Sequence, residues 1–103
     1  RALEIARRYF TAAEAAWLAG LGGQARETAF VRIWCAKEAM LKAHGRGIAF
    51  GLERLEFGER QGRLVLVDCD PELGAPEEWT LQAFEPAPDY LATLAWRAPT
   101  MGA

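Results

Sequence analysis

The sequence predicts an α+β domain in which helices come first and a mainly antiparallel sheet follows. In the first half, apolar residues recur at helical spacing and short glycine clusters separate the segments. In the second half, short runs of branched and aromatic residues alternate with glycine and proline turns. The length of 103 residues is that of one domain, so we treat residues 1–103 as a single unit.

The first segments predict two short elements before the main helix. Residues 1–10 form a short helical or extended lead-in. Thr11 is followed three residues later by Glu14, which is the pattern of a capping box, so a helix should begin there and continue to about Leu21. The glycines at 20–23 should end it.

The longest helix is predicted from about residue 26 to residue 44, where Gly45-Arg46-Gly47 stops it. We expect four residues of its apolar stripe to pack against the strand that carries Leu64 and Leu66, namely Phe30, Ile33, Trp34 and Leu41. The stripe consists of Phe30, Ile33, Trp34, Met40 and Leu41.

The remaining residues predict strands joined by turns. The expected strands are 52–57, 64–67, 79–85 and 90–97, with turns at 58–62 and 86–89 and a loop at 68–78. Residues 64–67 are apolar on both faces, which indicates a central strand. The tail, 99–103, is expected to be loose.

Composition excludes several classes of function. The formal net charge of −2 argues against binding of nucleic acid by phosphate neutralisation. We find no apolar run long enough to span a membrane and no signal peptide. Cys35 and Cys69 form no paired motif, which favours a reduced, cytoplasmic setting, with Cys35 as a packing residue. The chain opens at Arg1 without methionine, which is typical of a fragment.

Three charged residues on the long helix are candidates for a site. Lys37 falls inside the apolar stripe, so it needs an anionic partner or a water-filled pocket unless its ammonium snorkels from the edge. Glu38 and Lys42 lie together on the flank, one turn apart. Such a pair is often only a solvated salt bridge, but it can also hold an anion or a metal ion.

The residues around these charges resemble a known family. Trp34-x-x-Lys37-Glu38-Ala39-x-x-Lys42, followed by Gly45-x-Gly47, resembles the signature helix of the phosphopantetheinyl transferases, especially the larger, surfactin-synthetase type. Upstream, Arg7-Arg8-Tyr9-Phe10-Thr11-x-x-Glu14 looks like the segment that precedes it in that family. The two matches extend from about Ala6 to Gly47.

The resemblance implies transfer of 4′-phosphopantetheine from coenzyme A to a serine of an acyl or peptidyl carrier protein, with Mg²⁺ as cofactor. Glu38 would be the metal ligand, Lys42 would contact the diphosphate of coenzyme A, and Lys37 would lie near the same phosphates. Glu38 and Lys42 would therefore be the catalytic pair. Trp34 would pack beneath the site, and His44 would cap or pack the helix end.

The resemblance also implies that this chain is the C-terminal half of a molecule with two halves. These are related by an approximate twofold axis, and the active site lies between them. The family's second metal ligand, an aspartate in an upstream Gly-x-Asp segment, has no counterpart here. We therefore expect the chain alone to fold marginally, without transferase activity. It should self-associate through Val31 and Cys35 or pair with a missing N-terminal half.

Two other functions remain open from the sequence. The chain could be a module of the same fold that docks a carrier protein without catalysis. It could also be an unrelated α+β structural domain whose helix carries an ordinary salt bridge.

Overall fold

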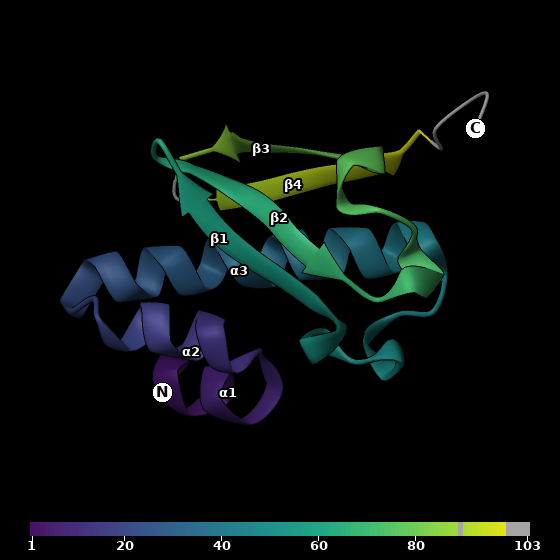
Figure 1. The fold of residues 1–103 in the computed structure, drawn as a ribbon. Helices are drawn as coiled ribbons and strands as arrows, with labels where there is room; N and C mark the ends of the chain where they lie inside the picture. The colour runs from purple at the N-terminus through teal and green to yellow at the C-terminus, as the bar shows by residue number, and fades with distance from the viewer. Residues whose placement is uncertain (89, 99–103) are drawn as a thin grey trace.

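The computed structural model describes residues 1–88 and 90–98. It confirms the α+β class, with three α-helices followed by four antiparallel strands within those residues (Figure 1). The helices are α1 (Ala2–Tyr9), α2 (Ala12–Ala19) and α3 (Gly23–His44). The strands are β1 (Leu55–Arg60), β2 (Arg63–Cys69), β3 (Trp79–Ala87) and β4 (Tyr90–Arg97). The predicted loose tail and residue 89 of the predicted turn lie outside the described residues.

The two short helices follow the local signals. The lead-in is helical, and the capping box at the start of α2 is complete. Glu14 N donates to Thr11 Oγ1 at 3.2 Å, and Thr11 N donates to Glu14 Oε1 at 3.0 Å. Both side chains thus satisfy backbone donors that a helix start leaves free.

The long helix α3 has 22 residues and begins slightly before the predicted start. It ends at His44 as predicted, because Gly45 adopts the left-handed conformation with φ +92°. The Gly45 N–H donates to the Leu41 carbonyl at 3.0 Å, which closes the last turn.

The strands form two hairpins instead of one sheet. β1 pairs only with β2, and β3 pairs only with β4, in the part of the chain that the structure describes. The prediction of a central strand at 64–67 is therefore wrong. Leu64 and Leu66 are half-buried against the core, whereas Val67 is 53 % exposed. The apolar character of β2 reflects contact with the core on one face, without a strand on its free edge.

The start of β1 also differs from the prediction. Residues 52–54, expected as strand, form a 3₁₀ turn, and the strand begins at Leu55. Gly51 precedes this turn with φ +114°, a conformation that turns the chain sharply and that other residues rarely adopt. The predicted turn at 58–62 narrows to Gln61 and Gly62, both with positive φ, as a two-residue hairpin requires.

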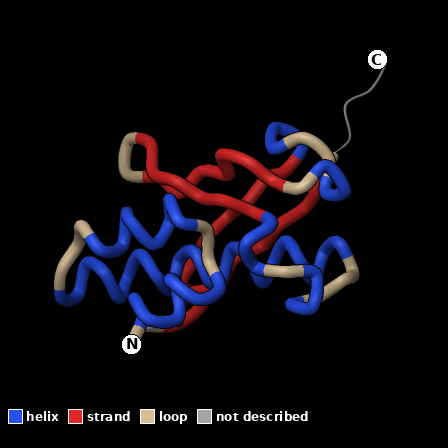
Figure 2. The backbone as a smooth tube through the Cα atoms, turned by 60° about the horizontal axis from the view of Figure 1, so that its bottom comes forward, coloured by secondary structure: helices blue, strands red, loops and turns tan. Residues whose placement is uncertain are grey.

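The helices and hairpins surround one core. Figure 2 shows most of the strands above the helices, and α3 lies along β4. Phe30 of α3 stacks on Phe10 with ring centroids 5.4 Å apart, and Trp34 lies tilted to Phe10 with ring centroids 6.4 Å apart. Phe10, between α1 and α2, thus contacts both rings, and their packing on β2 stays a prediction. Ile33 and Leu41 are buried as predicted.

None of the helices described by the structure is both long enough and apolar enough to pass through a membrane.

Candidate functional site

Helix α3 separates its side chains into a buried face and an open flank. Its buried residues recur every three or four positions: Ala29, Ile33, Ala36, Lys37, Met40 and Leu41. Glu38 follows directly after Lys37, and because successive helix residues differ by about 100° it points away from the core. Glu38 is half-buried, and Lys42, one turn later, is exposed.

Lys37 is fully buried, with 0 % of its surface exposed. Its ammonium lies 2.9 Å from Glu14 Oε1 and donates to the carbonyls of Leu52 and Leu55. The Phe10 ring centroid is 4.8 Å from the same nitrogen. A lysine ammonium has three N–H donors, and here three oxygen acceptors surround it. In this structure all three donors of Lys37 are used by protein oxygens and no solvent reaches them, and the expected place of Lys37 near the phosphates stays a prediction.

Glu14 is the anionic partner that the position of Lys37 required. Its Oε1 accepts from Thr11 N and Lys37 Nζ, and its Oε2 accepts from Phe57 N at 2.7 Å. Burial lowers the pKa of Lys37, and the negative charge of Glu14 opposes that shift. The sequence required such a partner but did not identify it, because the capping box already accounts for a glutamate at this position.

Glu38 and Lys42 are uncommitted. Neither side chain makes a hydrogen bond or an ion pair with any residue that the structure describes, and the two side chains do not pair with each other. The ordinary salt bridge, which their spacing allows, is therefore not formed. A carboxylate and an ammonium lie one turn apart on the same flank, and both can accept a ligand.

The neighbours of Glu38 serve packing. Cys35 is half-buried, and its Sγ lies 4.0 Å from the carbonyl of Leu91 in β4. Burial, together with the negative charge of Glu38, raises the pKa of the Cys35 thiol, which disfavours the thiolate needed for nucleophilic attack. Trp34 is half-buried and stacks on Phe30 at 6.1 Å. Both residues thus have the packing roles expected of them.

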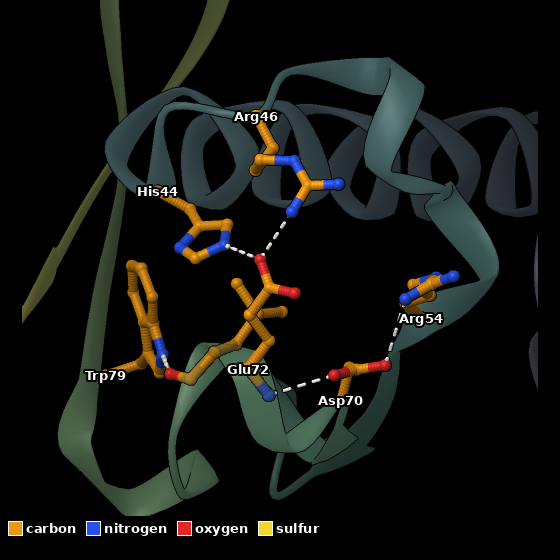
Figure 3. A network of polar contacts seen from close by, with 7 residues as sticks. His44, Arg46, Arg54, Asp70, Glu72 and Trp79 are labelled. Atoms are coloured by element: carbon orange, nitrogen blue, oxygen red, sulfur yellow. Dashed lines mark hydrogen bonds and ion pairs between the residues drawn. The ribbon is translucent and has the colours of Figure 1, made fainter.

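A polar network fixes the end of α3 (Figure 3). His44 Nε2 lies 3.0 Å from Glu72 Oε2, and Arg46 Nη1 lies 2.6 Å from the same oxygen. His44 also meets the Phe50 ring edge-on. The hydrogen bond to His44, and to a lesser extent the charge of Arg46, lowers the pKa of Glu72. His44 therefore packs and anchors the helix end, as predicted, by joining it to the segment after β2.

The metal expected at Glu38 can obtain only part of its ligand set here. In residues 1–88 and 90–98, no three His, Cys, Asp or Glu side chains come together closely enough to share an ion. Glu38 does offer the hard oxygen donor that Mg²⁺ prefers, and Mg²⁺ in proteins commonly takes one or two carboxylates and several waters. The residue therefore fits as one ligand of a magnesium site that other groups would complete.

Several hollows beside α3 lie away from this pair, and two of them are larger than a third of about 310 Å³. One, of about 500 Å³, opens between the two hairpins and is lined by Arg32, Arg63 and Leu81 among others. The other, of about 730 Å³, lies against the start of β4 and includes Val31, which is 43 % exposed. Neither Glu38 nor Lys42 lines them. A ligand of this pair would therefore rest on an open flank of α3.

Comparison with known proteins adds independent information. The sequence profile of the 4′-phosphopantetheinyl transferase superfamily matches residues 1–95. A curated protein of Synechocystis sp. (strain ATCC 27184 / PCC 6803 / Kazusa), named "Putative 4′-phosphopantetheinyl transferase", is 35 % identical over 81 residues. The match covers 79 % of this chain and 32 % of that protein, so the chain spans about a third of the length of its relative. No solved structure matches the chain significantly.

Proposed function

The chain belongs to the 4′-phosphopantetheinyl transferase superfamily, and we propose from this premise that it supplies part of the active site for one reaction. That reaction is the magnesium-dependent transfer of 4′-phosphopantetheine from coenzyme A to a serine of an acyl or peptidyl carrier protein. Glu38 serves as a metal ligand and Lys42 as a contact of the diphosphate. The setting is cytoplasmic, and the enzyme is of the surfactin-synthetase type.

In this reaction the serine oxygen forms a bond to the phosphorus that carries the pantetheine arm. The bond from that phosphorus to the bridging oxygen breaks, adenosine 3′,5′-bisphosphate leaves with the electron pair, and water takes up the serine proton. Negative charge on the diphosphate must be balanced throughout. A bound Mg²⁺ supplies charge neutralisation and orients the phosphate oxygens. Lys42 adds a mobile cation that suits a diffuse phosphate charge.

The observation that carries the proposal is the free pair on the flank of α3. A glutamate and a lysine one turn apart would ordinarily satisfy each other at low cost. In the described residues they do not, although both side chains reach solvent. Two opposite charges left unpaired on one face, within the family's signature helix, are suited to a metal-bound phosphate that contacts both.

The experiment is a transfer assay on the full-length protein with coenzyme A, Mg²⁺ and an apo carrier protein. The expected result is mass addition of one phosphopantetheine group to the carrier serine, which is lost when the metal is chelated. A serine-to-alanine carrier is the matched control. Absence of transfer from the folded, metal-loaded protein to several carrier proteins would contradict the proposal.

The second candidate is a module that docks a carrier protein without catalysis. It is favoured by the absence of a complete metal-ligand cluster from the described residues. The same assay separates the two: carrier binding without product formation would support docking alone. Under the leading proposal, a segment outside these residues pairs with this chain and provides the remaining ligands.

A further inference from the structure

We propose that the buried Glu14–Lys37 pair is a positioning device that holds Glu38 in place for its ligand. This inference rests on the proposed function, because it assigns to Lys37 an indirect role in the same site. Glu14 and Lys37 touch no substrate, and they act by fixing the orientation of helix α3.

The Glu14–Lys37 pair joins four segments: α3, α2, the turn before β1, and β1 itself. The Lys37 ammonium contacts Glu14 of α2, Leu52 of the turn before β1, and Leu55 of β1 itself. The second oxygen of Glu14 accepts from Phe57 N, also in β1. Every buried side-chain nitrogen or oxygen in the described part of the chain has a hydrogen-bond partner. The middle of α3 is therefore joined by directional bonds to α2 and β1.

These bonds control the rotation of α3 about its own axis. The other buried residues of its inner face are apolar, and helices packed through such contacts can slide slightly past their neighbours. Hydrogen bonds to fixed carbonyls oppose such movement, because they weaken steeply when the angle changes. Since Glu38 is the next residue, offset by about 100°, the direction of Lys37 sets the direction of the Glu38 carboxylate.

Stability alone does not account for a pair of this kind. Removing two charges from water is costly, and well-packed apolar residues of similar size often serve as well or better. A metal ligand, by contrast, must be held within about 0.5 Å of its productive position. A buried ion pair next to that ligand in the sequence can hold the ligand in its productive position.

The test uses the full-length protein and the double variant Glu14→Gln/Lys37→Met, which removes both charges and nearly keeps the volumes. Urea unfolding reports stability, and electron paramagnetic resonance of added Mn²⁺ reports metal affinity without reference to turnover. We expect the double variant to fold, with an unfolding midpoint below that of the wild type, because the carbonyls of Leu52 and Leu55 lose their donor. Mn²⁺ binding should be about tenfold weaker, as for other groups that orient a metal ligand. The kcat should fall more than the KM for coenzyme A rises.

One control variant and two outcomes decide between the proposals. Glu38→Gln identifies the Mn²⁺ signal that belongs to this site. If the wild type neither transfers the group nor binds Mn²⁺ through Glu38, the proposed function fails and this inference fails with it. If the wild type is active and the folded double variant keeps wild-type Mn²⁺ affinity, only the positioning role is overturned.

If the double variant does not fold, Glu14→Gln alone provides the test. Its amide oxygen can still accept from Lys37, while its amide nitrogen replaces the oxygen that accepts from Phe57 N. We expect this variant to fold and to bind Mn²⁺ measurably more weakly than the wild type. Unchanged Mn²⁺ affinity in the folded Glu14→Gln protein would also overturn the positioning role.

Discussion

The two lysines of this chain, Lys37 and Lys42, lie on the same helix and have opposite environments. Lys37 is fully buried, and three protein oxygens surround its ammonium. Lys42 is exposed and has no partner in residues 1–88 and 90–98. The comparison teaches that a charged residue in a signature motif can either stabilise the fold or bind a ligand. The exposed fraction of its side chain distinguishes the two roles.

The comparison extends to their acidic neighbours. Glu14 is buried with each carboxylate oxygen bonded to the protein, whereas the Glu38 carboxylate is half-buried and has no partner among the residues that the structure describes. The inner pair, Glu14 and Lys37, should therefore control stability and geometry. The outer pair, Glu38 and Lys42, should control binding and rate.

The largest effect is expected for Lys37→Met, which leaves the Glu14 carboxylate buried without its cation. Breaking a buried pair on one side typically costs about 3–5 kcal/mol, a large part of the stability of a small domain. Urea unfolding of the full-length protein measures it. The exposed Arg63→Met is the matched control and should leave the unfolding midpoint unchanged. An unchanged unfolding midpoint for Lys37→Met would show that the inner pair does not stabilise the fold.

Glu38→Gln should leave folding intact and remove most activity. The amide is a weaker, neutral ligand for Mg²⁺, and loss of one electrostatic element of a site raises the barrier by roughly 3 kcal/mol. Steady-state transfer of the pantetheine arm onto a carrier protein measures this loss, together with unfolding as a control for folding. Activity within about threefold of wild type, a difference of only about 0.7 kcal/mol, would mean that Glu38 is an ordinary surface carboxylate.

Lys42→Met should raise the KM for coenzyme A about tenfold, since a charge-assisted hydrogen bond contributes about 1.5–3 kcal/mol. Stability should not change, because no protein partner is lost within the described residues. Initial rates at varied coenzyme A, with Arg63→Met as a control for loss of a surface cation, measure it. A fall in stability with an unchanged KM for coenzyme A would show that Lys42, like Lys37, stabilises the fold and does not bind the ligand.

The smallest effect concerns the end of α3, where Glu72 joins His44 and Arg46. Because the pKa of Glu72 in the folded state lies below its ordinary value of 4.5, its contribution is fully present above pH 4.5. That contribution is lost as the pH falls through the lowered value. Urea unfolding of wild type and Glu72→Gln between about pH 3 and about pH 6 measures it. Parallel curves at all pH values would show that the network does not stabilise the fold.

The sequence predicted most of the elements because their signals are local. Thr11 and Glu14 mark the start of α2, and Gly45 marks the end of α3, through bonds made within a few residues. The division of the strands into two hairpins was not predictable in this way. The two apolar faces of residues 64–67 are typical of a central strand, and only tertiary contacts show that one edge stays unpaired.

The candidate site was predictable in part for the same reason. Glu38 and Lys42 were identified by spacing and by the family motif, and the structure leaves both free. The role of Lys37 depended on Glu14, 23 positions earlier, and on the carbonyls of Leu52 and Leu55. A helical wheel requires a partner for a buried lysine but cannot say which residue the fold brings to it.

The most direct test of the central claim is to label the two lysines by acetylation in the full-length protein and locate the label by mass spectrometry. In the native protein, Lys42 should react readily and become protected when coenzyme A and Mg²⁺ are added. Lys37 should react only after unfolding in urea. Labelling of Lys37 in the native protein, with protection by coenzyme A, would contradict the division between a lysine that acts through the fold and one that acts on the ligand.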